Sequence, residues 1–498
     1  MEWIIANMAP LMFGALVLFL LFGYPVAFAL AANGIVFGLL GIELGLLTPA
    51  LFQALPERIF GIMANDTLLA IPFFTFMGLI LERSGMAEDL LDTIGQLFGP
   101  LRGGLAYAVI FVGALLAATT GVVAASVISM GLISLPIMLR YGYDKRLASG
   151  VIAASGTLAQ IIPPSLVLII MADQLGRSVG DMYEGALVPG LVLTGLYVGY
   201  VVLLTLVKPD AAPALPPEAR TLRGGKLLLR VLTTLVPPLL LIFLVLGTIF
   251  LGIATPTEGG AMGAAGALIM AISRKRLSWK LLKQAMETTG KLSSFVVFIL
   301  VGATVFGLVF RGVNGDLWVE HLLLSLPGGQ LGFLIVVNIL VFVLAFFLDF
   351  FELSFIIVPL LAPVAEKLGI DLIWFGVLLG VNMQTSFMHP PFGFALFYLR
   401  SVAPASVKTT DIYWGAIPFV CIQIIMVAII IVFPGIVSYG DKTGMGATEQ
   451  TQVHDGSDLD ALMRGGDAGD SAKPAEGGGA PAGGDANADL LKQLQGNK

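Results

Sequence analysis

The sequence predicts an all-α polytopic membrane protein. Of its 498 residues, 57% are hydrophobic and only 12% are charged, and the mean hydropathy is +0.93. A soluble protein of this size carries about twice that fraction of charge. The apolar runs extend over roughly 20 residues, the length of a membrane-crossing helix, and not the roughly 10 residues of a barrel strand.

Composition also weighs against several function classes. Cys421 is the single cysteine, so neither an intramolecular disulfide nor a cysteine-rich metal site can form. The three histidines lie far apart without metal-ligand spacing, no GxxxxGK[ST] phosphate loop occurs, and no basic nucleic-acid footprint is present. We therefore expect no enzyme, no cofactor, no bound metal beyond a coupling ion and no nucleic-acid partner.

The first half of the chain predicts four spans, one broken helix, two amphipathic segments and one hairpin. The N-terminus lacks a basic n-region and a cleavage site, which indicates a first span and not a removed signal peptide. Residues 104–139 form a 36-residue apolar run with a small, polar middle, which favours a hairpin that enters the membrane and returns. In order, the segments are two spans within residues 1–40 broken at Gly23-Tyr24-Pro25, an interfacial segment at 48–63, a span at 67–81, an amphipathic piece at 87–98, the hairpin, a broken helix at 147–171 and a last span at 182–207.

The second half predicts the same order after a Pro-rich, charged linker. Spans at residues 227–251 and 255–272 precede a basic amphipathic segment at 273–291 and a span at 292–310. A second hairpin at 331–364 is interrupted by Asp349-Phe350-Phe351-Glu352, and a second broken helix at 372–400 and a last span at 412–436 follow.

These segments group into eight parts. We expect scaffold helices with an interfacial arm at 1–82, half of a transport domain with the first hairpin and broken helix at 83–176, and a closing helix at 177–207. A cytoplasmic linker at 208–226 precedes the second scaffold part at 227–313, the second transport-domain half at 314–403 and a last helix at 404–440. Residues 441–498 form an acidic tail without an apolar face, which we expect to be disordered.

Two polar, Pro-Pro-interrupted stretches organise the chain: residues 155–165, SGTLAQIIPPS, and residues 382–392, NMQTSFMHPPF. Proline lacks the amide hydrogen and clashes with the preceding turn, so each pair should break a helix. The freed backbone groups need partners in protein or in a water-lined cavity. Two such breaks at corresponding places in two halves indicate a transporter binding site.

The two halves repeat each other. Pro136, Gly142-Tyr143-Asp144 and Pro163-Pro164 recur with the same spacings as Pro363, Gly369-Ile370-Asp371 and Pro390-Pro391. Further on, the pattern D-x-Y-x-G-A at 181–186 recurs at 411–416. Scattered leucines and valines arise by chance between apolar helices, whereas this ordered set indicates an internal repeat.

The distribution of basic loops then predicts the topology. The loops at 140–146, 208–230, 273–291 and 400–408 all lie on one side if both hairpins return without crossing. Each half then has five crossings plus one re-entrant hairpin, so the halves are inverted and both termini are periplasmic. This is the build of a secondary transporter embedded in membrane lipid.

Because no ATP-hydrolysing element is present, an ion gradient should drive transport, and oxygen-bearing residues near the breaks are candidate Na⁺ ligands. A single Ser or Thr in a membrane helix more often bonds to its own backbone, whereas a carboxylate in the membrane, above all Asp349, favours a functional role. The candidates at the first hairpin and break are Thr119, Thr120, Gly121, Ser126, Ser155, Gly156 and Thr157, and those at the second are Asp349, Glu352, Ser354, Asn382, Gln384, Thr385 and Ser386.

Candidate substrate contacts lie at the breaks themselves. His389 precedes the second Pro-Pro pair and could donate to an anion or relay a proton, and a packed structural histidine is an equal alternative. Glu258 in Thr255-Pro-Thr-Glu258 reads as part of a helix cap, and Arg311 either attracts a carboxylate or snorkels to the interface. The substrate candidates are Pro163, Pro164, Ser165, His389, Pro390 and Pro391.

Over residues 10–438 the chain resembles the large membrane subunit of tripartite ATP-independent periplasmic (TRAP) transporters. The resemblance rests on GVVAASVISMGLISLPIMLRYGYD (121–144), ASGTLAQIIPPS (154–165), ATPTEGGAMGAAGA (254–267) and FLDFFELSFIIVPLLAPVAEKLGID (347–371). It implies a Na⁺-coupled, elevator-type importer of organic acids in a bacterial inner membrane. It also implies a small four-helix membrane subunit and a periplasmic substrate-binding protein as partners, with the amphipathic segments bracing the scaffold.

The chain departs from the commoner family pattern at Gly121-Val122, at Asn382–Ser386, at His389 and after Asp349. These features resemble the branch that handles 2-oxo acids, lactate or similar monocarboxylates. Two other transport functions stay open: a single-component cation-coupled carboxylate symporter of the same build, and an anion channel. An intramembrane enzyme comes last, because no nucleophile–base pair is evident.

Overall fold

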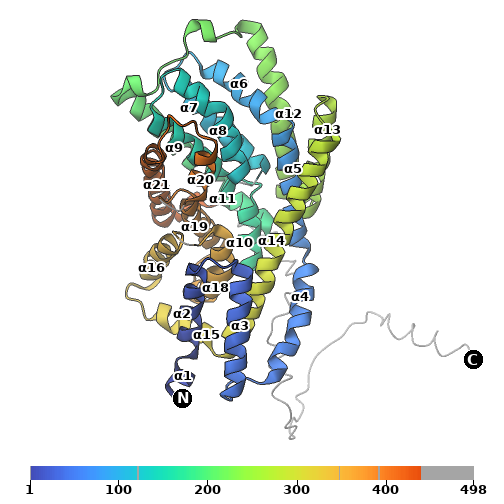
Figure 1. Ribbon diagram of the computed structural model, residues 1–498, viewed down its shortest axis with the longest axis vertical. Coiled ribbons are helices and arrows are strands. Elements are labelled where there is room, and N and C mark those ends of the chain that lie inside the picture. Colours follow the sequence, from blue (N-terminus) through green and yellow to red (C-terminus); the bar gives the residue numbers. More distant parts are fainter. Residues whose placement is uncertain (1, 121–122, 347, 391–392, 439–498) are drawn as a thin grey trace, which may run out of the picture. The chain divides into compact units, whose positions relative to one another are not determined.

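The computed structural model describes residues 2–120, 123–346, 348–390 and 393–438, and every regular element among them is helical (Figure 1). Six helices are long and apolar enough to cross a membrane, or up to eight if each of two bent helix pairs counts as one span. The prediction of a helical, multi-pass membrane protein is confirmed. Gly121, Pro391 and the predicted tail at 441–498 lie outside the described residues.

The helices follow the predicted order in both halves. The first half contains α1 (Glu2–Ala6), α2 (Met8–Leu21), α3 (Val26–Glu43), α4 (Leu55–Met63), α5 (Ala70–Arg83), α6 (Met86–Phe98), α7 (Gly104–Thr120), α8 (Val123–Arg140), α9 (Lys145–Thr157), α10 (Leu166–Gln174) and α11 (Val179–Val207). The second contains α12 (Gly224–Phe250), α13 (Pro256–Ser273), α14 (Trp279–Gly312), α15 (Gly315–Leu324), α16 (Gly329–Leu344), α17 (Phe350–Glu352), a π-helical turn (Leu353–Ile357), α18 (Val358–Lys367), α19 (Leu372–Gln384), α20 (Phe394–Val402) and α21 (Thr409–Val432).

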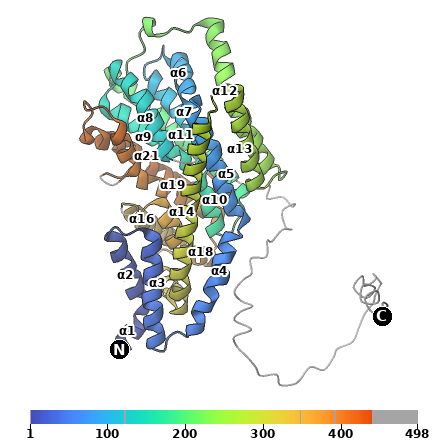
Figure 2. The same cartoon turned by 45° about the vertical axis from the view of Figure 1, so that its right-hand side comes forward.

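Helices of one half pack against helices of the other in matched pairs. The helix α3 packs along α14, and α5 packs along α13 (Figures 1 and 2). In chain order α3 corresponds to α13 and α5 to α14, so the two contacts are equivalent under the repeat. The broken helices pair in the same way, because α9 contacts α20 and α10 contacts α19. The two broken helices therefore run side by side in opposite directions at the junction of the halves.

Two glycines allow a close crossing between α9 of the first half and α21 of the second. A Cβ added to Gly150 of α9 would lie 2.1 Å from the carbonyl oxygen of Gly415 in α21. A Cβ on Gly415 would lie 2.1 Å from the carbonyl oxygen of Arg146. The backbones approach so closely that a methyl group has no room, which is the usual role of small residues between membrane helices.

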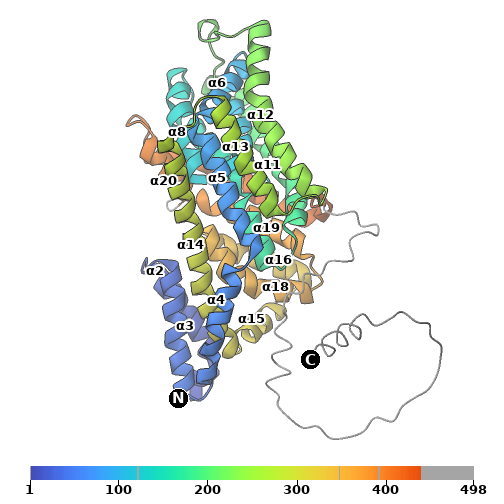
Figure 3. The same cartoon turned by 90° about the vertical axis from the view of Figure 1, so that its right-hand side faces the viewer.

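The basic amphipathic segment predicted at 273–291 does not form a helix separate from the span that follows it. Residues from Trp279 to Gly312 form one continuous 34-residue helix, α14, capped by Ser278, whose hydroxyl accepts from the Leu281 amide. The sequence appeared to change from a basic arm to an apolar span near Lys291, but no proline interrupts the turn there. In the first half, α4 and α5 are separate helices that meet at a 45° bend (Figure 3).

The sequence did not reveal α15. This helix leads from α14 to α16 and bends against α16 by 117°. Its place in the chain order matches that of α6, which leads from α5 to α7. The correspondence extends the repeat to the segments before the hairpins.

The predicted linker at 208–226 is hydrogen-bonded to the first half through its backbone. The carbonyl oxygens of Ala211 and Ala212 accept from the amides of Asp144 and Gly103, both at 2.9 Å, and the Leu215 amide donates to Gly99 at 2.9 Å. Ala212 is fully buried. Residues 211–215 are therefore part of the packed structure and not a free tether, because their proline-rich backbone finds partners in the turns between α6 and α7 and between α8 and α9.

Asp89 of α6 gathers three arginines on the side of the basic loops. Arg230 lies 3.3 Å from its carboxylate, Arg274 3.6 Å and Arg276 3.0 Å. The Arg276 guanidinium also donates to the carbonyl oxygens of Ser84 and Gly85. One carboxylate thus ties α6 to the start of α12 and to the turn between α13 and α14.

Candidate binding site at the repeat junction

The first Pro-Pro stretch breaks its helix as predicted. The helix α9 ends at Thr157, a 3-10 turn covers Leu158–Gln160, and α10 begins at Leu166. The peptide bond between Pro163 and Pro164 is cis. Ser165 caps α10, because its hydroxyl accepts from the Val167 amide at 3.2 Å and donates to the Gln160 carbonyl at 2.6 Å.

The second stretch breaks its helix at the equivalent place. The helix α19 ends at Gln384, a 3-10 turn covers Thr385–Phe387, and α20 begins at Phe394. The Asn382 amide donates to both the backbone and the side-chain oxygen of Asn338 in α16, at 2.8 and 2.9 Å. Hairpin and broken helix are therefore held together by amide hydrogen bonds in this half.

A buried polar contact joins the two breaks. Nε2 of Gln384 donates to Oγ1 of Thr157 at 3.1 Å, and Nε2 of Gln423 donates to the same oxygen at 3.4 Å and to the Tyr197 hydroxyl at 2.9 Å. All four side chains are fully buried. Within the described chain, neither glutamine Oε1 accepts a hydrogen bond, so two carbonyl oxygens face the interior unpaired.

A cavity of about 280 Å³ lies between the hairpins, the broken helices and α14; we call it the central cavity. Its wall is largely apolar and aromatic, with Gln160, Asp349 and Tyr398 as its polar members. Its described lining residues are Val123, Ala124, Gln160, Leu166, Val167, Leu292, Phe295, Asp349, Phe350, Phe351, Phe387, Phe394 and Tyr398.

The central cavity lies on the junction of the internal repeat. The proline landmarks Pro136 and Pro363 are 227 residues apart, and so are Pro163 and Pro390. Four pairs of lining residues have the same separation: Val123 and Phe350, Ala124 and Phe351, Gln160 and Phe387, and Val167 and Phe394. Each half therefore contributes the same structural positions to one shared cavity.

Four helices begin at this cavity. Val123 is the first residue of α8, Leu166 of α10, Phe350 of α17 and Phe394 of α20, and all four line the wall. The short α17 continues without a break through the π turn into α18, so each of the four starts a helical segment of at least nine residues. Helix N-termini carry partial positive charge, so the arrangement favours an anion.

Asp349 and Glu352 stabilise a helix start. The Glu352 amide donates to Oδ1 of Asp349 at 3.0 Å, and the Asp349 amide donates to Oε2 of Glu352 at 3.0 Å, which is a capping box. Asp349 also lines the central cavity, whereas Glu352 lines a different cavity beside Tyr24 and Phe295. The two carboxylates, predicted as one cluster, therefore face different spaces.

The remaining ion candidates divide into partnered and unpartnered groups. Ser155 and Thr157 donate to carbonyls of their own helix at 2.6 and 2.8 Å, as does Thr385 at 2.7 Å. The Ser386 hydroxyl is buried without a partner in the described chain, and Ser354 touches the sulfur atoms of Met171 and Met383. Gly156 packs against Val127 and Ser126 is fully buried, while the side chains of Thr119 and Thr120 lie outside the described residues.

None of the described substrate candidates is a lining residue of the central cavity; these candidates are Pro163, Pro164, Ser165, His389 and Pro390. His389 is 1% exposed, its ring stacks on Phe346 with centroids 4.2 Å apart, and its edge meets Phe342 at 4.3 Å. The structure thus places this histidine between the rings of Phe342 and Phe346 and outside the described lining of the central cavity.

Sequence reasoning missed the aromatic and amide residues of the wall. Phe350, Phe351, Phe387 and Phe394 were not distinguishable from phenylalanines that face lipid. Gln160 is 2% exposed and its Oε1 is unpaired within the described chain, although it sits inside the first Pro-Pro stretch. Its repeat equivalent is Phe387 beside the second break, so both breaks contribute the same position to the wall.

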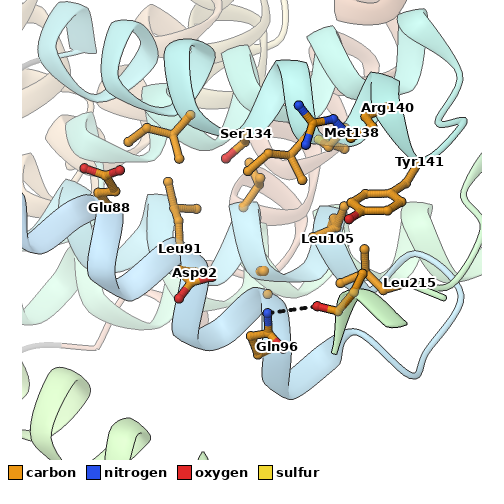
Figure 4. A pocket seen from close by; sticks show the side chains of 16 residues that line it. Glu88, Leu91, Asp92, Gln96, Leu105, Ser134, Met138, Arg140, Tyr141 and Leu215 are labelled. Atoms are coloured by element: carbon orange, nitrogen blue, oxygen red, sulfur yellow. Dashed lines mark hydrogen bonds between the residues drawn. The ribbon is translucent and has the colours of Figure 1, made fainter. Parts of the chain in front are cut away.

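A second cavity of about 310 Å³ lies between α6, α7, α8 and the linker (Figure 4). Glu88, Asp92 and Arg140 point toward it, and the Gln96 amide donates to the Ala219 carbonyl at its edge (3.2 Å). Its described lining comes from the first half and the linker only, so it does not lie on the junction of the internal repeat. We therefore place the candidate site in the central cavity.

Comparison with known proteins agrees with this architecture. Residues 13–436 match the family described as tripartite ATP-independent periplasmic transporter, DctM component. The chain belongs to this family. As a DctM component it is a membrane-embedded transporter permease and not an enzyme, and the name of the family implies two further components.

Individual relatives support the assignment to the DctM family. The "C4-dicarboxylate TRAP transporter large permease protein DctM" of Pseudomonas aeruginosa is 30% identical over 400 residues, covering 78% of this chain and 90% of the relative. The "Sialic acid TRAP transporter permease protein SiaT" of Haemophilus influenzae is 26% identical over 388 residues, covering 78% of this chain and 62% of that longer protein. Among solved structures, the Alcanivorax borkumensis YdaH transporter matches with a TM-score of 0.55 at 15% identity, covering 77% of this chain and 88% of that one. That likeness concerns the fold alone.

Proposed function

We propose that this chain imports small organic acid anions, coupled to Na⁺, as the large permease subunit of its TRAP transporter. The observation that carries the proposal is the meeting of four helix starts at a cavity shared by equivalent positions of both halves. A secondary transporter places its substrate at such a repeat junction, and helix N-termini there favour anionic groups.

The coupling ion follows from charge. Asp349 is the one formally charged side chain among the described lining residues, and a carboxylate beside an anionic substrate is unfavourable unless a cation accompanies it. We propose that Na⁺ binds near Asp349 and near the polar residues of the breaks, including Gln384 and Ser386. The unpaired oxygens of Gln384, Gln423 and Ser386 supply the type of ligand that Na⁺ prefers.

The mechanism that we propose is of the elevator type. Residues 83–176 and 314–403 form the moving domain, and residues 1–82 and 227–313 the scaffold, with helices 177–207 and 404–440 closing each half. The antiparallel pairing of α9–α10 with α19–α20 supports two inverted repeats. The positive-inside rule then places Asp89 and its arginines in the cytoplasm and both termini in the periplasm.

The partners are those of a tripartite system. We propose a small four-helix membrane subunit and a periplasmic binding protein that delivers the substrate, in a bacterial inner membrane. Relatives are named for C4-dicarboxylate, isethionate and sialic acid, all organic anions. The central cavity has one polar amide, one phenol and five phenylalanines, and this lining supports a small monocarboxylate such as lactate or a 2-oxo acid.

Reconstitution tests the proposal. The chain is placed in proteoliposomes with the small membrane subunit from the same genome, and uptake of labelled lactate, pyruvate and succinate is measured with and without the purified binding protein and an inward Na⁺ gradient. Uptake of a monocarboxylate that needs both supports the proposal. Uptake without the binding protein would indicate a single-component symporter, and Na⁺-independent flux above carrier rates would indicate a channel; either result overturns it.

A further inference from the structure

A third cavity, of about 230 Å³, lies between α4, α10, α14 and the segment 355–360. Its basic lining residues are Arg58 on α4 and Arg311 in the last turn of α14, and its one acidic lining residue among those described is Asp173 at the end of α10. We call it the arginine cavity. The positive-inside topology puts it on the periplasmic side, because Arg311 ends a helix that starts at the basic loops.

Neither arginine forms an ion pair within 4.0 Å in the described chain. The charge of Arg311 acts unfavourably on the partly buried Arg58 guanidinium, and the neighbouring Glu57 acts in the opposite direction. Like charges across one small space repel each other, and an anion between them reverses the sign of the interaction. Guanidinium groups also match the geometry of a carboxylate.

Asp173 does not neutralise them. Its Oδ1 accepts from the Asn65 amide at 2.6 Å, and its Oδ2 accepts from the Gln174 amide at 2.9 Å. Both carboxylate oxygens are thus engaged by neutral donors. The cavity keeps one net positive charge from its three charged lining residues.

Three elements lead from the arginine cavity to the central cavity. On α10, Asp173 lies six residues beyond Val167, which is about 9 Å along a helix. On α14, Thr304 lies nine residues beyond Phe295, or about 14 Å. The helical segment that starts at Phe350 lines the central cavity with its first turn and the arginine cavity with Phe355 and Ile356.

We infer that Arg58 and Arg311 form a capture site for the carboxylate group of the substrate, on the periplasmic path to the central cavity. The identity of the anion rests on the proposed function, whereas the electropositive character of the cavity does not. The structure thereby assigns to these two arginines a role in collecting an anion before it reaches the helix starts.

Charge-selective thiol labelling tests the site without transport. Thr304 in the cavity wall is replaced by cysteine in a Cys421→Ser background, and the protein is placed in phosphatidylcholine nanodiscs. Labelling rates are measured with an anionic sulfonatoethyl and a cationic trimethylammonioethyl methanethiosulfonate. We expect the anionic-to-cationic rate ratio to fall about tenfold when Arg58→Gln and Arg311→Gln are combined. Asp173→Asn, which removes the negative charge and keeps the size of the side chain, should raise the ratio.

Ser325, exposed in the turn between α15 and α16, supplies the matched control. At Ser325→Cys the same arginine replacements should change the ratio by less than about twofold, because charge effects in water fade over a Debye length. An unchanged ratio at position 304, or no labelling there by either reagent, overturns the inference. Loss of the arginine effect on adding phosphatidylglycerol would assign the pair to lipid phosphate and also overturn it.

Transport gives the second readout. In the reconstituted system, Arg58→Gln with Arg311→Gln should raise KM at least about fivefold with kcat nearly unchanged, and the Lys variants should retain most of the affinity. A shifted labelling ratio with no uptake of any carboxylate would overturn the proposed function and leave the anion site standing. Normal labelling selectivity with an unchanged KM would overturn the capture role.

Discussion

Gln384 donates to Thr157 at 3.1 Å, and the two residues are repeat equivalents 227 positions apart. The hydrogen bond therefore joins the same structural position in both halves. Gln423 from α21 shares the Thr157 oxygen, so the contact also ties the broken helices to a closing helix. This contact lies where the two halves meet, so its loss should lower the free energy of unfolding of the helix bundle.

Thr157→Val should lower the free energy of unfolding by about 1–3 kcal/mol, because it leaves the buried Gln384 amide without its acceptor. Thermal unfolding in detergent measures the change. Thr194→Val is the control, since the Thr194 hydroxyl donates only to the Gly190 carbonyl of its own helix. Equal effects of the two substitutions would contradict a special role for the junction.

Ala124→Phe should abolish uptake while the protein folds normally. Ala124 lines the central cavity, as does its equivalent Phe351, and an added ring would occupy a large part of about 280 Å³. Ala124→Ser, which adds one oxygen, should keep most of the activity. Uptake by reconstituted protein and the melting temperature of both variants check the prediction, and wild-type uptake by the Phe variant would remove this cavity from the path.

Asp349→Asn should strongly reduce Na⁺-driven uptake, with a change in unfolding free energy below about 1 kcal/mol, because Asn is as good a helix cap as Asp. Asp349→Ala should lose the cap as well and cost about 0.5–2 kcal/mol. Glu352→Gln should affect uptake less than Asp349→Asn, since Glu352 faces a different cavity. The Na⁺ dependence of uptake and the melting temperature separate these effects; equal uptake by the two carboxamide variants would argue against a coupling role specific to Asp349.

Gly150→Ala and Gly415→Ala should each destabilise the protein by about 1–3 kcal/mol, because a methyl group would meet a backbone oxygen at 2.1 Å. Gly199→Ala on α11, where the added Cβ meets nothing within 4 Å, is the matched control and should be neutral or slightly stabilising. Unfolding in detergent compares the three. Tolerance of alanine at both crossing glycines would show that α9 and α21 can separate at no cost.

Asp89→Asn should destabilise the tie between α6 and the basic loops by about 1–2 kcal/mol, because three arginines share that partly buried carboxylate. The effect should shrink in high salt, as expected for partly exposed ion pairs. Glu287→Gln breaks an exposed pair with Lys283 and should cost at most about 0.5 kcal/mol. Melting temperatures at low and high salt test both, and a salt-independent loss at Asp89 would point to packing instead of charge.

The parts of the fold that the sequence predicted are those with local signals. Proline pairs marked both helix breaks, and Pro136, Gly142 and Asp144 marked the repeat, because each residue acts on its own turn. The start of α17 was visible as an interruption at Asp349, although its capping box was not recognised. The continuity of α14 was missed because a change from polar to apolar residues looks like a boundary when packing against α3 and α5 is unknown.

The site was less predictable for the same physical reason. A phenylalanine that lines a cavity and one that faces lipid have the same local sequence signal, and the chain has 32 phenylalanines. Only the meeting of distant helices tells Phe351 from its neighbours. His389 is the converse case: its place beside a predicted break drew a functional expectation, whereas its contacts with Phe342 and Phe346 had no local signal in the sequence.

The unbroken α14 constrains how this protein can change. Leu292 and Phe295 line the central cavity, Phe298 and Ile299 the cavity beside Tyr24, and residues from Leu300 to Arg311 the arginine cavity. Each residue of an α-helix advances the direction of its side chain by about 100°. One inserted or deleted residue after Phe295 would turn Thr304 and Arg311 away from their cavity while leaving Leu292 in place. We therefore expect this stretch to keep a fixed length among functional descendants, with substitutions tolerated and indels eliminated.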